Sequence, residues 1–197
     1  MKKKDIVPEK YSLWLSELKQ RIRNSQQKAI LAVNTELIKL YWQIGNDILT
    51  RQKNEGWGSK VIERLSKDLK CEFPDIKGFS RANMMYMRSF AEAWPDFEEN
   101  PIVQQAVGQI PWSHNLALIG KLKDRDKRLA YTQKIQENGW SRNVLIHQIE
   151  NKLLERQGKS SNNFKAFLAP AQSELAQETL KDPYIFDFLA LAAEAKE

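Results

Sequence analysis

Four residues in the segment 80–94 have side chains suited to reading nucleic acid: Arg81, Asn83, Met84 and Arg88. On a helical wheel, Arg81, Met84 and Arg88 fall opposite an apolar stripe that comprises Phe79, Ala82, Tyr86, Phe90, Ala93 and Trp94. Arginine can make paired hydrogen bonds to guanine, and asparagine can make them to adenine. We therefore expect Arg81 and Arg88, together with Asn83 and Met84, to approach base edges or phosphates from this helix.

A second group of basic residues recurs at helical spacing just before this segment: Lys60, Arg64, Lys67 and Lys70. Ser59 is placed to cap the start of their helix, Pro74 ends it, and the opposite side is apolar. The cations therefore face outward, where they would contact backbone phosphate and give a salt-dependent affinity with little sequence preference. An ordinary solvated face has the same pattern, and that alternative stays open for each residue.

The sequence offers little for catalysis or metal binding. His114 and His147 have no carboxylate or thiol beside them at ligand spacing, and the single Cys71 cannot form an internal disulfide. The chain has no Gly-rich phosphate loop and no G-x-S-x-G elbow. We therefore expect no catalytic residue, no cofactor and no bound metal.

The positive charge of the chain is concentrated in its N-terminal half. Residues 1–94 contain 18 Lys and Arg against 11 Asp and Glu, whereas the whole chain has a net charge of +6. A basic half beside a near-neutral remainder is typical of a surface that attracts phosphate, although many basic proteins only have a solvated positive face.

Composition indicates an ordered, soluble protein. The chain has 197 residues, of which 42% are apolar, and this suffices for a sizeable core. Its apolar runs are much shorter than the roughly 20 residues of a membrane-spanning helix. The basic start is followed by charge and Pro8 rather than an apolar signal region, so we expect a cytoplasmic protein that does not contact a membrane.

Apolar residues spaced three and four apart predict helices along most of the chain. We expect helices over about 8–24, 26–53, 59–73 and 80–94, with a break at Asn24 and Ser25, a loop over 95–111 and further helices after it. The pair 59–73 and 80–94 has the outline of a helix-turn-helix, which any helical hairpin shares.

The long helix 26–53 carries an apolar stripe with near-heptad spacing. Such a stripe packs either within the subunit or along the same helix of a second copy. We favour packing within the subunit, and a homodimer through this helix stays open.

A short pattern occurs twice at helix corners. Gly56 and Trp57 precede a serine that begins a helix, and Gly139 and Trp140 do the same. The repetition indicates either two related helical units or a common solution to turning a corner.

The chain changes character after residue 158. Residues 159–170 are polar and have no helical period, so they read as a linker after a helical domain over 1–158. Residues 171–197 predict short helices whose apolar residues need a packing partner.

Several segments, taken in order, resemble the N-terminal domain of YhcG-type bacterial proteins, a domain of unknown function. They include AVNTELIKLYWQIG, GWGSKVIERLSKDL, FPDIKGFSRANMMYMRSFAEAWP, IPWSHNLALIGKLKD, ENGWSRNVLIHQIE and LKDPYIFDFL. The resemblance implies a helix-turn-helix DNA-binding module, followed in longer relatives by a C-terminal nuclease domain of the PD-(D/E)xK superfamily. The segment around Asp182 resembles the join between the two, which implies that the catalytic nuclease domain is absent from this chain.

We therefore expect a mostly α, multi-helix domain with a helix-turn-helix-like pair and room for minor β structure. Its predicted role is to hold double-stranded DNA without catalysing a reaction. The alternative is a helical protein-interaction or dimerisation module with no role in nucleic-acid binding. Salt would separate the two, because phosphate binding weakens steeply as salt rises and an apolar helix interface does not.

Overall fold

The computed structural model of the chain describes residues 10–157. This range contains eight α-helices, one 3-10 turn (η1) and no strand. The elements are α1 (Tyr11–Glu55), α2 (Ser59–Glu72), η1 (Lys77–Phe79), α3 (Arg81–Ala93), α4 (Pro101–Gly108), α5 (Trp112–Lys121), α6 (Arg125–Asn138), α7 (Arg142–Glu150) and α8 (Leu153–Gln157). The expected mostly α, multi-helix fold is confirmed. The predicted linker 159–170 and the segment 171–197 lie outside the described residues.

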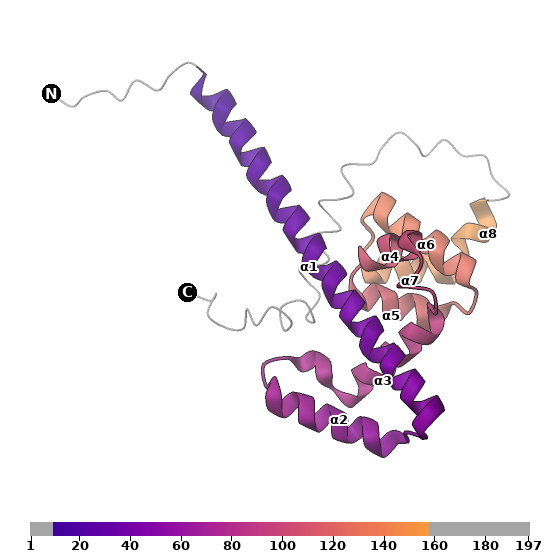
Figure 1. Cartoon of the computed structure of the whole chain (residues 1–197). Coiled ribbons are helices and arrows are strands. Elements are labelled where there is room, and N and C mark those ends of the chain that lie inside the picture. Colours follow the sequence, from indigo (N-terminus) through magenta and orange to yellow (C-terminus); the bar gives the residue numbers. More distant parts are fainter. Residues whose placement is uncertain (1–9, 158–197) are drawn as a thin grey trace.

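Helix α1 is the longest element, and it packs mainly against α3 and α4. Helices α4 to α8 gather on one side of it, while α2 lies across its C-terminal end (Figure 1). The helix has 45 residues, so it is about 68 Å long. It ends at Gly56, whose left-handed backbone (φ 66°) glycine adopts without strain.

The predicted break at Asn24 and Ser25 is wrong, because α1 continues through both residues. The side chain of Asn24 accepts a hydrogen bond from Gln20 one turn earlier, at 2.9 Å. Asparagine and serine lower helix propensity by only a few tenths of a kcal/mol. The residues that follow are anchored in the core, and that anchoring outweighs so small a penalty.

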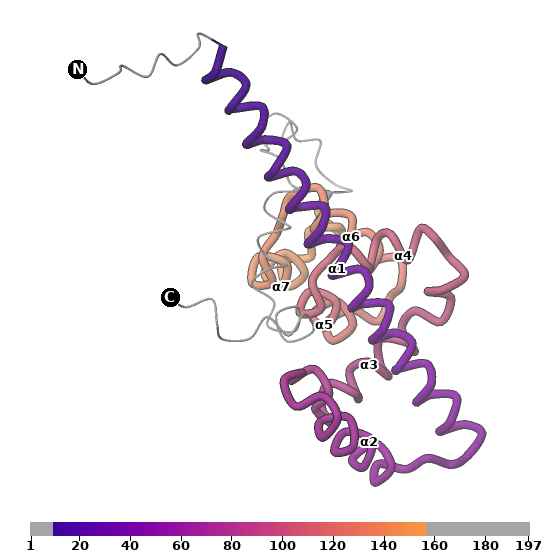
Figure 2. The backbone as a smooth tube through the Cα atoms, turned by 60° about the vertical axis from the view of Figure 1, so that its left-hand side comes forward, coloured from indigo at the N-terminus to yellow at the C-terminus, as the bar shows by residue number. Residues whose placement is uncertain are grey.

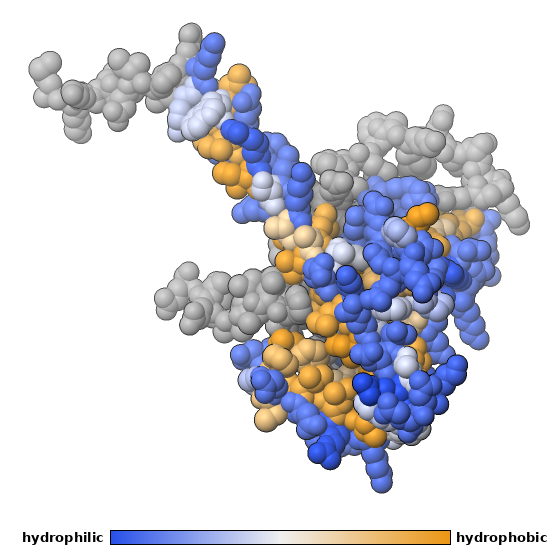
Figure 3. Space-filling model, in the orientation of Figure 1, coloured by the Kyte–Doolittle hydropathy of each residue, from blue (hydrophilic) through white to orange (hydrophobic). Residues whose placement is uncertain are grey.

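The N-terminal part of α1 projects away from the body of the molecule, as two views agree (Figure 1, Figure 2). Apolar side chains line this part and remain exposed (Figure 3), among them Tyr11, Leu13, Trp14 and Ile22, which are 42–63% exposed. The buried residues of α1 begin only at Asn34. We call residues 11–30 the projecting arm.

The main core lies between the second half of α1 and α3. Leu37, Tyr41 and Ile48 of α1 are at most 1% exposed and belong to one apolar cluster with Met87 and Phe90 of α3. Much of the apolar stripe of residues 26–53 is thus covered within the chain, as the favoured interpretation expected. Ile30, Val33, Leu40 and Ile44 of the stripe stay partly exposed, and a homodimer through it remains a prediction.

A single glycine allows α1 and α3 to approach each other. A Cβ atom at Gly45 would lie 2.0 Å from the carbonyl oxygen of Met87, well inside any van der Waals contact. Gly45 is therefore required by the close passage of two backbones.

Aromatic rings fill the core around this crossing, and some of its buried polar groups are hydrogen-bonded. The ring of Trp112 lies edge-on to the rings of Tyr41 and Phe90, with centroids 5.0 and 5.2 Å away. The indole of Trp42 donates a hydrogen bond to the carbonyl oxygen of Trp94 at 2.7 Å. Such pairing fixes the position of each ring, because a buried donor without a partner would cost about 1–3 kcal/mol.

The segment 95–111, predicted to be a loop, contains α4. The side chain of Asn100 caps this helix by accepting hydrogen bonds from the backbone of Ile102 and Val103, and Pro101 occupies its first turn. Val103 and Val107 are buried in the core. The acidic residues that suggested a loop precede the cap.

A second apolar cluster joins α5, α6 and α7. It is made of Ile110, Ala117, Leu118, Tyr131, Ile135, Leu145 and Ile149.

No helix among residues 10–157 is long and apolar enough to cross a lipid bilayer.

Candidate nucleic-acid interface

Helices α2 and α3 are joined by a fixed connection, residues 73–80. Ser66 donates a hydrogen bond to the carbonyl oxygen of Phe79 at 2.7 Å, and the Ser80 hydroxyl caps α3 by accepting from the backbone of Asn83 at 3.2 Å. A Cβ atom at Gly78 would lie 2.2 Å from the Tyr41 hydroxyl, so the connection is pressed against α1. This connection is longer than the turn of about three to four residues in a helix-turn-helix.

Of the four residues predicted to read bases, Asn83 and Met84 do not lie on an outer face. Asn83 is 1% exposed and Met84 0%. The Asn83 amide donates to the carbonyl oxygen of Gly78 at 2.7 Å and accepts from the Trp112 indole at 2.8 Å, so it stabilises the core. Their predicted exposure is wrong, because α3 is buried by α1 and α5 over a wider sector than the wheel indicated. Tyr86, assigned to the apolar stripe, is 49% exposed.

The two arginines of α3 differ in accessibility. Arg81 is exposed at the first turn. The side chain of Arg88 is only 30% exposed, lies 3.6 Å from the Glu92 carboxylate and has a buried Nε without a partner among the described residues. Arg81 is therefore the arginine of α3 that can reach a partner without rearrangement.

The predicted basic row of α2 lies on an open surface. Lys60, Arg64, Lys67 and Lys70 are all exposed. Arg64 and Lys67 make i,i+4 ion pairs with Asp68 and Glu63, at 3.7 and 3.0 Å. Such exposed pairs contribute little free energy. Ser59, predicted to cap this helix, is its first residue, and the cap position is Gly58, which makes no side-chain cap bond.

A carboxylate links α2 to the start of α3. The hydrogen bond and the charge of Lys67, and more weakly the charge of Arg81, lower the pKa of Glu63. Arg81 therefore lies close enough to α2 for its charge to act on Glu63. We call the surface formed by five exposed cations the α2–α3 basic surface: Lys60, Arg64, Lys67, Lys70 and Arg81.

Two tighter corners occur elsewhere, where the sequence repeats its Gly-Trp pattern. Gly56 and Gly139 both have left-handed backbones, with φ of 66° and 59°, and the helices that follow begin within three residues. The α6–α7 pair therefore has the turn length of a helix-turn-helix, which the prediction placed at α2–α3. The exposed residues Arg142 and Asn143 begin α7. The Gly139 signal was in the sequence, but it was interpreted as a helix corner or a sign of two related helical units, not as a helix-turn-helix.

Each of the two histidines lies within hydrogen-bond distance of a group in the chain. His114 is 1% exposed and its Nε2 lies 2.8 Å from the carbonyl oxygen of Trp140, while His147 lies 2.8 Å from the Asn151 amide. Within the described part of the chain, no group of three or more His, Cys, Asp or Glu residues could hold a metal ion.

Comparisons with known proteins place the chain in a family. A protein of Escherichia coli (strain K12) described as "Putative nuclease YhcG" is 27% identical over 210 residues, which covers 89% of this chain and 55% of that protein. The chain thus spans about half the length of that relative. No solved structure matches the chain. The DUF1016 N-terminal domain matches residues 17–156, and the chain therefore belongs to the DUF1016 N-terminal domain family.

Proposed function

We propose that this chain is a non-catalytic module that binds double-stranded DNA through the α2–α3 basic surface. The observation that carries the proposal is the arrangement of five exposed cations on two helices whose connection is held rigidly against α1. The relative is described as a nuclease, and the family match is to an N-terminal domain. Both support assigning binding, rather than cleavage, to this part of such a protein.

The dimensions of the surface suit a DNA backbone. Lys60 and Lys70 are ten residues apart on α2, or about 15 Å along the helix axis. This length corresponds to about four phosphates at the axial rise of one strand, about 3.4 Å. Arg81 adds a cation at the N-terminus of α3, where the helix dipole also favours an anion.

The ion pairs on α2 do not prevent this contact. Arg64 and Lys67 are 85% and 74% exposed, so each can exchange its carboxylate partner for a phosphate at little cost in free energy. Lys60, Lys70 and Arg81 have no ion pair with any residue in the range 10–157. These three side chains are expected to supply most of the affinity.

The test is the salt dependence of binding to a fluorescently labelled 20-base-pair duplex, followed by anisotropy. Five phosphate contacts give a slope of log K against log salt of about −4.5, equivalent to a loss of about 500-fold between 50 and 200 mM salt. The variant Lys60→Ala, Lys70→Ala, Arg81→Ala leaves two contacts, and its expected slope is about −1.8.

Two control variants make the experiment specific. Lys19→Ala, Lys28→Ala, Lys39→Ala removes the same charge from exposed positions of α1 and should keep the steep slope. Arg142→Ala tests the α6–α7 corner. The proposal is overturned if no duplex binds at 50 mM salt, if the α1 variant weakens binding as much as the α2–α3 variant, or if only Arg142→Ala weakens it.

A second candidate function is helical association through the projecting arm, whose exposed apolar residues favour it. This candidate moves the predicted interface toward the N-terminal end of α1, because much of the apolar stripe of residues 26–53 packs against α3 within the chain. Light scattering across a concentration series at high salt tests it. A monomer at every concentration would exclude self-association, and a dimer that persists in Trp14→Ser, Ile22→Ser would exclude the arm as its interface.

A further inference from the structure

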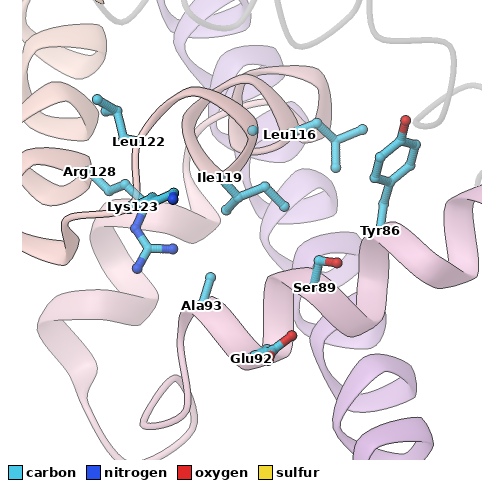
Figure 4. Close-up of a pocket in the computed structure, with 10 residues that line it drawn as sticks. Tyr86, Ser89, Glu92, Ala93, Leu116, Ile119, Leu122, Lys123 and Arg128 are labelled. Carbon is cyan, nitrogen blue, oxygen red and sulfur yellow. The ribbon is translucent and has the colours of Figure 1, made fainter.

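A groove runs between α3, α5 and α6, beyond the first turn of α3 at which Arg81 lies. Its volume is about 660 Å³, within the range of small-molecule sites. Figure 4 shows Arg128 and Lys123 at one end, apolar side chains along the floor and an aromatic ring at the other end. The floor is formed by Ala93, Ile119 and Leu116, and the ring is that of Tyr86.

Arg128 is a buried cation that makes no ion pair with any residue in the range 10–157. The residue is only 8% exposed, and its Nε makes no hydrogen bond. None of the carboxylates in residues 10–157 forms an ion pair with it. Its neighbour Arg125 is different, since it hydrogen-bonds to the Asp96 carboxylate at 2.6 Å. Burial, and then the charge of Arg125, lower the pKa of Arg128, and the charge of Asp124 opposes this shift without forming an ion pair.

The surroundings of Arg128 offset only part of the cost of burying its charge. The guanidinium lies 4.8 Å from the centroid of the Trp94 ring, a favourable cation–π distance. Glu92, the acidic residue that also lines the groove, lies beside Arg88 at 3.6 Å. A buried charge that lacks a carboxylate or phosphate partner destabilises a fold. An uncharged side chain of similar length would fill the same space more favourably if the position were purely structural.

We propose that this α3–α5–α6 groove binds a small organic anion whose carboxylate or phosphate pairs with Arg128. Lys123 lies at the same end, and the apolar or aromatic body of the ligand lies along Ile119 and Leu116 toward Tyr86. Arginine suits this role because its planar fork binds carboxylate and phosphate oxygens in pairs. The site does not depend on the proposed DNA contact.

The length of the groove sets the size of the ligand. Ala93 and Tyr86 are seven residues apart on α3, or about 10 Å. A single nucleotide or a medium-chain carboxylic acid extends over such a distance. The two differ in their anionic group, so they serve as probes that separate a phosphate ligand from a carboxylate ligand.

The test is isothermal titration of the full chain with octanoate, thymidine 5′-monophosphate and inorganic phosphate. One of the two organic probes is expected to bind more tightly than inorganic phosphate, and its identity assigns the anionic group. Arg128→Met should weaken that binding by at least about tenfold, the factor typical of a charge-assisted hydrogen bond. The same variant should melt no lower than the wild type, because it removes an unpaired buried charge.

A second variant fills the groove without touching Arg128. A Cβ atom at Gly120 has no atom within 4 Å, so Gly120→Met adds bulk to the groove without disturbing the core. It should weaken binding by a similar factor, whereas Arg142→Met on the exposed start of α7 should not. The proposal is overturned if neither organic probe binds, if inorganic phosphate binds as tightly as both, or if Arg128→Met and Gly120→Met bind like the wild type.

Discussion

Replacing Gly45 by alanine is expected to destabilise the protein, although alanine is the better helix former. The new Cβ atom would lie 2.0 Å from the Met87 carbonyl oxygen, and a normal contact requires at least 3.0 Å. The backbones of α1 and α3 would therefore have to separate by about 1 Å, a gap that removes a quarter to a half of the dispersion energy of the affected contacts.

The expected magnitude follows from two opposing terms. Overpacking costs about 1–3 kcal/mol and more where backbone must move, while Gly to Ala in a helix recovers up to about 1 kcal/mol. Because the new Cβ atom is fixed to the backbone of α1 and meets the backbone of α3, the overpacking cost should lie at or above the upper end of its range, and we expect a net loss of about 2–4 kcal/mol. For a chain of this size the melting temperature should fall by about 6–12 °C.

The measurement is urea unfolding followed by circular dichroism, with Gly120→Ala as the matched control. Gly120 lies in α5 with open space around its Cβ position, so the same substitution should stabilise the protein by a few tenths to about 1 kcal/mol. Equal effects of the two substitutions, or a stable Gly45→Ala variant with an unchanged unfolding slope, would refute the close packing of α1 and α3 at this point.

Three further predictions concern buried and capping groups. Asn83→Ala removes two buried hydrogen bonds and should cost about 1–3 kcal/mol in thermal or urea unfolding, a result that an outward-facing side chain would not give. Ser80→Ala should cost about 1 kcal/mol in the same assay and Ser59→Ala almost nothing, because only Ser80 caps its helix; equal losses would contradict this assignment. The hydrogen bond from Arg125 lowers the pKa of Asp96 in the folded protein. The ionised Asp96 therefore stabilises the fold fully above the pKa of an aspartate in the unfolded chain, about 4. This stabilisation is lost as the pH falls through the lower pKa of Asp96 in the folded protein. The melting temperature should therefore fall more steeply from about pH 5 to about pH 2 in the wild type than in Asp96→Asn, and parallel curves would exclude this contribution.

Local signals predicted the helix ends well where a side chain or a glycine decides the backbone. The Ser80 cap, the Gly56 and Gly139 corners and the stop at Trp94 are all found in the structure, because each depends on residues next to one another in sequence. The same reasoning failed at Asn24, where packing of residues further along α1 outweighs a weak local preference. It also missed α4, whose cap at Asn100 follows an acidic stretch.

The candidate site was harder to predict, because exposure depends on more than one neighbouring helix. A wheel shows that α3 has an apolar side but not that α1 and α5 cover it from two directions, which is why Met84 and Asn83 are buried. The outward direction of the α2 row was predicted correctly, since α2 has one apolar side. Arg128 was not singled out, because its lack of a counter-ion is a property of the folded neighbourhood and leaves no pattern in the sequence.

The core holds α1 only from Asn34 onward, and this anchoring also keeps the projecting arm helical. An isolated segment of about 20 residues is marginal as a helix in water, because its first turn must nucleate without help. In this chain the core fixes the turns from Asn34 onward, so each residue of the arm only extends an existing helix, and no separate nucleation is needed. The backbone amide protons of α1 should therefore exchange with solvent at graded rates, fastest near Tyr11 and progressively slower toward Leu37, because the helix opens most often at the end that the core does not hold.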